Sequence, residues 1–185
     1  MTLILSLETS TKNCSVALFY KENLLLLKQE NTINYSHSEQ LTIFIQETLR
    51  NADKSIKELD AVAISRGPGS YTGLRIGTST AKGICYALDI PLISISTLQA
   101  MAFGLAVKDH KYDLFCPMID ARRMEVFAAL YDQNNNKIRN VQADVLDKDT
   151  YKEYLEKKIV FFGDGSEKYK GVINHNNAIF VDNFL

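Results

Sequence analysis

The glycine-rich stretch SRGPGSYTGLRIGTSTAKG, residues 65–83, has the residue types of a phosphate-binding loop that leaves a strand and enters a helix. A Walker A loop needs G-x-x-x-x-G-K-S/T, and neither Gly67 nor Gly69 has a second glycine at that spacing. A dinucleotide-binding loop needs G-x-G-x-x-G, and Gly73 falls one position too late for it. The stretch therefore matches neither motif.

Other catalytic patterns are missing from the sequence. No serine has the G-x-S-x-G spacing of a nucleophile elbow, and there is no HExxH motif or paired set of His and Cys ligands. The cysteines show no C-x-x-C spacing, which argues against a disulfide framework or a zinc site and favours a reducing compartment. The residues concerned are His37, His110, His175, Cys14, Cys85 and Cys116.

Polar residues at the ends of two apolar runs are the remaining candidates for nucleotide chemistry. Glu8, Thr9 and Ser10 follow the first run, and Asp120 ends a similar run later in the chain. An active ATPase or small-molecule kinase would place these four residues around a Mg-nucleotide. Polar residues at strand ends are more often turn formers.

A row of small residues marks the helix after the glycine-rich loop. Gly73, Gly77, Ala81 and Cys85 recur at intervals of four. Glycine inside a helix costs about 1 kcal/mol relative to alanine, so this row predicts close approach by another element. Packing within the chain and contact with another subunit both fit the pattern.

The elements that position these residues can be read from hydrophobic periodicity. LILSL, CSVALFY and LLLLKQE predict a three-stranded meander, and AVAIS and PLISIS predict two further strands. A capping box of Ser36 and Glu39 predicts a helix near residue 36, the glycine-rich loop opens a helix to about Leu88, and Ser96 with Gln99 opens a third. The predicted order is β-β-β-α-β-α-β-α.

A similar pattern begins at Tyr112 with DLFCPMIDA, RRMEVFAALYD and KIRNVQ, which indicates an old duplication. Thr150 and Glu153 predict one more helix, and IVFFGDG a late strand, without the helices of the first half. Two β-β-β-α-β-α halves describe an α/β, actin-like ATPase (ASKHA, RNase H-like) fold with a reduced second lobe. We expect lobes at residues 1–108 and 109–185.

Composition narrows the function. The 185 residues are 46% hydrophobic, and 21 Lys+Arg against 22 Asp+Glu give a net charge of -1. Such a chain lacks the basic field that a nucleic-acid backbone requires, so any RNA should be held mostly by a partner. No run approaches the ~20 apolar residues of a membrane span, and we expect a soluble cytoplasmic protein with no membrane contact.

The sequence resembles the TsaB (YeaZ) family. The matching stretches are LSLETST, YSHSEQL, SRGPGSYTGLRIG with the following AKG, PLISISTLQAMA, PMIDARRMEVFAALYD and FFGDG. The resemblance implies a non-catalytic scaffold for a TsaD-like threonylcarbamoyltransferase that makes threonylcarbamoyladenosine in tRNA. It also implies a C-terminal tail that continues beyond the position of Leu185.

The resemblance implies that the first two helices bind the TsaD-like subunit and pair two copies of the chain when it is alone. The predicted interface residues are Leu41, Phe44, Ile45, Thr48, Tyr71, Thr72, Gly73, Arg75, Gly77 and Ala81. A TsaE-like accessory ATPase is a further expected partner, and tRNA is contacted only through the complex.

The resemblance also implies what the chain lacks. Thr97 and Met101 stand where TsaD has two metal-binding histidines, and Lys12 stands where TsaD has an acid. A hydroxyl and a thioether are poor ligands for iron or zinc. We therefore expect no catalytic residue, metal or cofactor on the isolated chain, with ATP and metal on partner subunits. A glycoprotease-type peptidase is the remaining alternative, and it lacks both an activated nucleophile and a metal-bound water.

Overall fold

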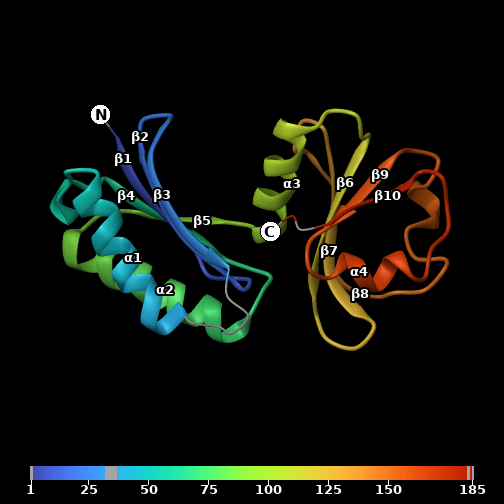
Figure 1. Ribbon diagram of the computed structural model, residues 1–185, viewed down its shortest axis with the longest axis horizontal. Helices are drawn as coiled ribbons and strands as arrows, with labels where there is room; N and C mark the ends of the chain where they lie inside the picture. Colours follow the sequence, from blue (N-terminus) through green and yellow to red (C-terminus); the bar gives the residue numbers. More distant parts are fainter. Residues whose placement is uncertain (1, 32–36, 183, 185) are drawn as a thin grey trace. The chain divides into compact units, whose positions relative to one another are not determined.

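The computed structural model describes residues 2–31, 37–182 and 184. The chain divides into two compact units, residues 1–96 and residues 97–185, each built on a five-stranded sheet (Figure 1). The predicted boundary at residue 108 lies one helix later than this division.

The first unit has the predicted meander and crossovers. Its elements are β1 (Leu3–Glu8), β2 (Asn13–Tyr20), β3 (Asn23–Asn31), α1 (His37–Asn51), a single 3-10 turn (Ile56–Glu58), β4 (Ala61–Ser65), α2 (Tyr71–Leu88) and β5 (Leu92–Ile95). The strand order is β3-β2-β1-β4-β5. β1 is antiparallel to β2 and parallel to β4, so α1 and α2 are crossover connections.

Alternation along the strands creates the core of the first unit. Leu3, Leu5 and Leu7 of β1 point to one face, and all three are buried. Leu5 pairs with Leu18 of β2 and Val62 of β4, which extends the apolar face across the sheet. Helices α1 and α2 both pack on this face and contact each other (Figure 1).

The helix ends are partly as predicted. Helix α2 runs from Tyr71 to Leu88 as expected, and the Ser70 Oγ accepts a 3.3 Å hydrogen bond from the Gly73 N–H as an N-cap. The proposed cap of α1 at Ser36 lies outside the described residues. Ser96 precedes α3, but its Oγ has no hydrogen-bond partner in the described part of the chain, so the predicted capping box does not form there.

The second unit repeats the strand order of the first. Its elements are α3 (Thr97–Lys108), β6 (Leu114–Asp120), β7 (Glu125–Asp132), β8 (Lys137–Val145), a 3-10 turn (Lys152–Tyr154), β9 (Ile159–Phe162), α4 (Ser166–Lys170) and β10 (Ala178–Val181). The order β10-β9-β6-β7-β8 matches β5-β4-β1-β2-β3, and the parallel and antiparallel pairings agree. This confirms the duplicated α/β fold.

The second unit is reduced in its helices rather than its strands. The sequence predicts a helix from Thr150, but only a 3-10 turn forms, because Tyr151 adopts a left-handed φ of 64°. Helix α4 has five residues. Helix α3 packs on β6 and β7 through Leu98, Ala102 and Leu105, which is why it belongs to this unit.

A candidate partner-binding face on helix α2

The glycine-rich loop packs against the turn between β1 and β2. Gly67 has a φ of +101°, which favours glycine, and a Cβ on Gly69 would collide with the carbonyl oxygen of Ser10. The Ser70 N–H donates a 2.6 Å hydrogen bond to that same oxygen. These glycines therefore let two backbone segments of one unit meet.

The small-residue row of α2 faces the sheet of its own unit. Gly73, Gly77, Ala81 and Cys85 are all buried, and Ala81 has no exposed area. A Cβ on Gly77 would collide with the Thr9 Oγ1 and lie 3.0 Å from the Ile64 Cδ1. The prediction that Gly73, Gly77 and Ala81 contact a partner is therefore wrong, because all three are buried and Thr9 and Ile64 already occupy the space in front of Gly77.

The residues of α1 that were predicted to contact a partner are also buried in their own unit. Leu41, Phe44, Ile45 and Thr48 are 1%, 8%, 4% and 0% exposed and pack within the first unit. An amphipathic helix on a sheet buries its apolar stripe against that sheet. These four residues are core residues, and the prediction that they form the partner surface is also wrong.

The outward face of α2 holds the predicted residues that remain accessible. Tyr71 is 74% exposed, and Thr72 and Arg75 are exposed beside it. The Arg75 guanidinium lies 5.4 Å from the centre of the Tyr71 ring, and its Nη1 is 3.5 Å from the Tyr71 Oη. Stacking on the ring orients the guanidinium while leaving it in solvent.

Sequence reasoning missed the remainder of this face. Tyr86 is 92% exposed, and Lys82 is exposed between it and Arg75. A shallow groove of about 260 Å³ lies next to Arg75, lined by Tyr71, Leu74, Arg75, Thr78 and Ser79. The available signal was the helical spacing of Tyr71, Arg75, Lys82 and Tyr86 opposite the small-residue row.

The residues proposed around a nucleotide in the first unit are engaged within that unit. The Glu8 carboxylate accepts a 2.6 Å hydrogen bond from the Ser10 N–H and another from the Ser65 hydroxyl. The Thr9 Oγ1 donates to the Gly73 carbonyl at 2.8 Å. Ser10 is 1% exposed, and its Oγ has no partner among the described residues. Gly69 packs against the Ser10 carbonyl, so these contacts hold the turn against the glycine-rich loop.

Asp120 in the second unit is also engaged. Its carboxylate lies 2.6 Å from the Lys168 Nζ and accepts the Arg122 N–H at 2.5 Å. The Asp120 N–H donates to the Asp164 carboxylate at 2.9 Å. Asp120 therefore fixes the C-terminal end of β6 and the turn that follows it.

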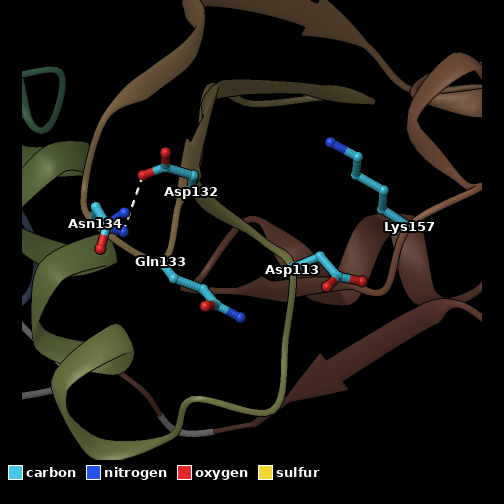
Figure 2. Close-up of a pocket in the computed structure, with 5 residues that line it drawn as sticks. All are labelled: Asp113, Asp132, Gln133, Asn134 and Lys157. Atoms are coloured by element: carbon cyan, nitrogen blue, oxygen red, sulfur yellow. Dashed lines mark hydrogen bonds between the residues drawn. The ribbon is translucent and has the colours of Figure 1, made fainter.

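A polar hollow of about 370 Å³ in the second unit is lined by Asp113, Asp132, Gln133, Asn134 and Lys157 (Figure 2). The Asp132 carboxylate accepts the Asn134 N–H at 2.9 Å, and a hydrogen bond from the Asn136 side chain lowers the pKa of Asp132. The Gln133 Nε2 donates to the Tyr112 carbonyl at 2.9 Å. These bonds fix the turn between β7 and β8 and tie it to the segment before β6.

Metal-ligating side chains are scattered. Within the described ranges, no group of three or more His, Cys, Asp or Glu side chains could hold a metal ion. Thr97 is 2% exposed at the start of α3, and the Met101 Cε lies close to Gly163.

Burial raises the pKa of the Cys14 thiol to about 11. No described helix is long and apolar enough to cross a membrane.

The repeated sheet order and its crossovers define an actin-like α/β protein, and the outward face of α2 exposes Tyr71 and Tyr86. Residues 31–174 match the family model described as TsaD, tRNA N6-adenosine threonylcarbamoyltransferase. YeaZ from Pseudomonas aeruginosa superposes with a TM-score of 0.78 at 26% sequence identity, over 100% of this chain and 86% of that chain.

Relatives described as tRNA threonylcarbamoyladenosine biosynthesis protein TsaB include proteins from Buchnera aphidicola, Bacillus subtilis and Haemophilus influenzae. The protein of Buchnera aphidicola subsp. Acyrthosiphon pisum is 32% identical over 98% of this chain and 84% of its own length. That of Bacillus subtilis is 30% identical over 92% and 74%, respectively. That of Haemophilus influenzae is 38% identical over 67% of this chain, which spans only 51% of that relative's length. The chain belongs to the TsaB (YeaZ) family.

Proposed function

We propose that this chain is the non-catalytic partner subunit of a TsaD-like threonylcarbamoyltransferase, in the biosynthesis of threonylcarbamoyladenosine in tRNA. The observation that carries the proposal is the exposed stripe of Tyr71, Arg75 and Tyr86 on α2. We name this stripe the α2 face. Membership of the TsaB family supports the choice of pathway.

The α2 face has the composition of a binding hot spot. Tyrosine and arginine are enriched at such positions because they bury a large area and also form polar contacts. Tyr86 is 92% exposed, so its ring contributes little to the core of the free chain. The groove beside Arg75 can receive a side chain from the partner, and the Arg75–Tyr71 stack limits the entropy lost on binding.

The remaining assignments follow from this role. The TsaD-like subunit supplies the metal and catalytic residues, and a TsaE-like ATPase supplies the nucleotide chemistry. With a net charge of -1, the chain contacts tRNA only through the complex. We place it in the cytoplasm, and without its partner two copies pair through the α2 face.

Reconstitution tests this proposal. Purified TsaD-like subunit, the other pathway proteins and tRNA are assayed for threonylcarbamoyladenosine with and without this chain. We expect the chain alone to give no product and the full mixture to lose activity when the chain is omitted. Product formation by the isolated chain, or full activity without it, would contradict the proposal.

A further inference from the structure

The turn between β6 and β7 has a strained backbone. Arg122 and Arg123 have φ values of 71° and 46°, so two consecutive non-glycine residues are left-handed. Asn-Gly is the pair that such turns favour, because it adopts positive φ with little penalty. Turn formation therefore does not explain two arginines here, and strain of this kind accompanies functional segments.

Both guanidinium groups are available for a ligand. Arg122 and Arg123 are exposed, and neither side chain has an ion-pair or hydrogen-bond partner in the part of the chain that the structure describes. The nearby Asp120 is already paired with Lys168. An arginine fork binds a carboxylate or a phosphate through two parallel hydrogen bonds, so the pair can hold an anionic partner.

The turn is held firmly enough to present these groups. The Arg122 N–H donates to the Asp120 Oδ1 at 2.5 Å, and the Glu125 N–H donates to the Arg122 carbonyl at 3.0 Å. The Ala121 N–H also donates to the Glu125 carbonyl at 3.1 Å. Val126 follows the turn with no exposed area and anchors β7 in the core.

Exposed apolar side chains adjoin the two arginines. Met124 is 43% exposed and Val145 is 64% exposed. They are neighbours, because Val145 pairs with Glu125 and the Leu146 N–H donates to the Met124 carbonyl at 2.8 Å. Arginine and methionine are enriched in protein interfaces, where apolar contact is bordered by polar groups.

The surroundings favour a protein over RNA. The turn has no aromatic side chain on which a base could stack, and the exposed Glu125 lies beside the arginines. The whole chain carries a net charge of -1. A phosphate backbone at this turn would meet the Glu125 carboxylate as well as the two guanidinium groups, and it would leave Met124 and Val145 in water.

We propose that Arg122, Arg123, Met124 and Val145 form a second protein-contact surface, which fits a partner carrying carboxylates around an apolar contact. We name it the β6–β7 tip. It rests on the proposed function in one respect, because its partner belongs to the same modification reaction. It lies in the second unit, whereas the α2 face lies in the first.

Arginine-specific labelling tests the two surfaces separately. The full chain is treated with phenylglyoxal alone, with tRNA, and with each pathway protein, and each arginine is quantified by mass spectrometry. We expect Arg122 and Arg123 to react about ten-fold more slowly with a protein component present and unchanged with tRNA alone. Arg139, held bidentately by Asp144, is the internal control and should react slowly in every sample.

The outcomes are distinct. Protection of Arg75 without protection of Arg122 and Arg123 supports the α2 face and overturns the β6–β7 tip. Protection of Arg122 and Arg123 by tRNA alone overturns the assignment to a protein. If Arg122 and Arg123 each react at the same rate in every sample, no component covers them and the proposed β6–β7 tip is overturned.

A turn variant separates binding from folding. Arg122→Asn combined with Arg123→Gly removes both guanidinium groups and relieves the left-handed strain. We expect the melting temperature to rise by about 5 °C and the reconstituted modification rate to fall about ten-fold. A variant that is as active as the wild type in that reaction would overturn the proposal.

Discussion

Two glycines of the same helix should respond to alanine with opposite signs. Gly77 faces the Thr9 and Ile64 side chains, and an added Cβ would collide with the Thr9 Oγ1. Gly83, three turns from the start of α2, has nothing within 4 Å of the position of a Cβ and is exposed. Gly83→Ala is therefore the matched control for Gly77→Ala.

The magnitudes follow from the contacts. Overpacking at Gly77 costs about 1–3 kcal/mol. Displacing Thr9 also breaks its 2.8 Å hydrogen bond to the Gly73 carbonyl, which costs about 1–3 kcal/mol in a buried site. Alanine returns about 1 kcal/mol of helix propensity at either position. The middle of these ranges gives a net loss of about 3 kcal/mol for Gly77→Ala, and Gly83→Ala gains about 1 kcal/mol.

Thermal unfolding of the two purified variants, followed by circular dichroism, measures the difference. For a unit of this size, about 1 kcal/mol shifts the melting temperature by about 4–8 °C. Gly77→Ala should therefore melt roughly 12–24 °C below the wild type, and Gly83→Ala about 4–8 °C above it. If Gly77→Ala unfolded at or above the wild-type temperature, the small-residue row would not pack against its own sheet.

Two further predictions concern buried groups. Asp144→Ala should lower the free energy of unfolding by about 3–5 kcal/mol in urea titrations, because Arg139 loses its bidentate partner and the Tyr151 hydroxyl loses its acceptor. The control is Lys152→Ala, which removes the exposed ion pair with Asp149 and should change the free energy of unfolding little. Comparable losses in both variants would contradict this account. Burial raises the pKa of Cys14 from 9.0 to about 11, so the folded state retains the thiol proton to higher pH than the unfolded chain. Stability should be unaffected by this group below pH 9 and fall between pH 9 and 11, and the fall should be shallower in Cys14→Ala; parallel pH profiles would contradict the assignment.

The strands could be predicted because the alternation of apolar and polar residues fixes which side chains of an extended segment share a face. Leu3, Leu5 and Leu7 must share a face in any extended segment, and the same pattern recurs in the second half of the chain. The repeated order of the two sheets follows from this duplication. The boundary between the two units was harder to predict. The apolar residues of α3 do not specify whether the helix packs on the sheet that precedes it in the sequence or on the sheet that follows it.

The interface could be predicted only in part. A row such as Gly73, Gly77 and Ala81 indicates close approach, and a strand of the same chain produces the same pattern as a helix of a partner. Only the direction of the row in the folded unit decides between them, and it points to β1 and β4. Tyr71, Thr72 and Arg75 remain a prediction for the partner surface, because they are exposed on the opposite side of α2.

Calorimetric titration with the TsaD-like subunit is the most direct test of the α2 face. The wild-type chain is compared with Tyr86→Ala and with Phe103→Ala, which removes an aromatic ring that is 56% exposed on α3. We predict that Tyr86→Ala weakens binding about 30-fold, as expected for a hot spot worth about 2 kcal/mol, and that Phe103→Ala binds like the wild type. Wild-type affinity for Tyr86→Ala, together with weakened binding for Phe103→Ala, would contradict the assignment.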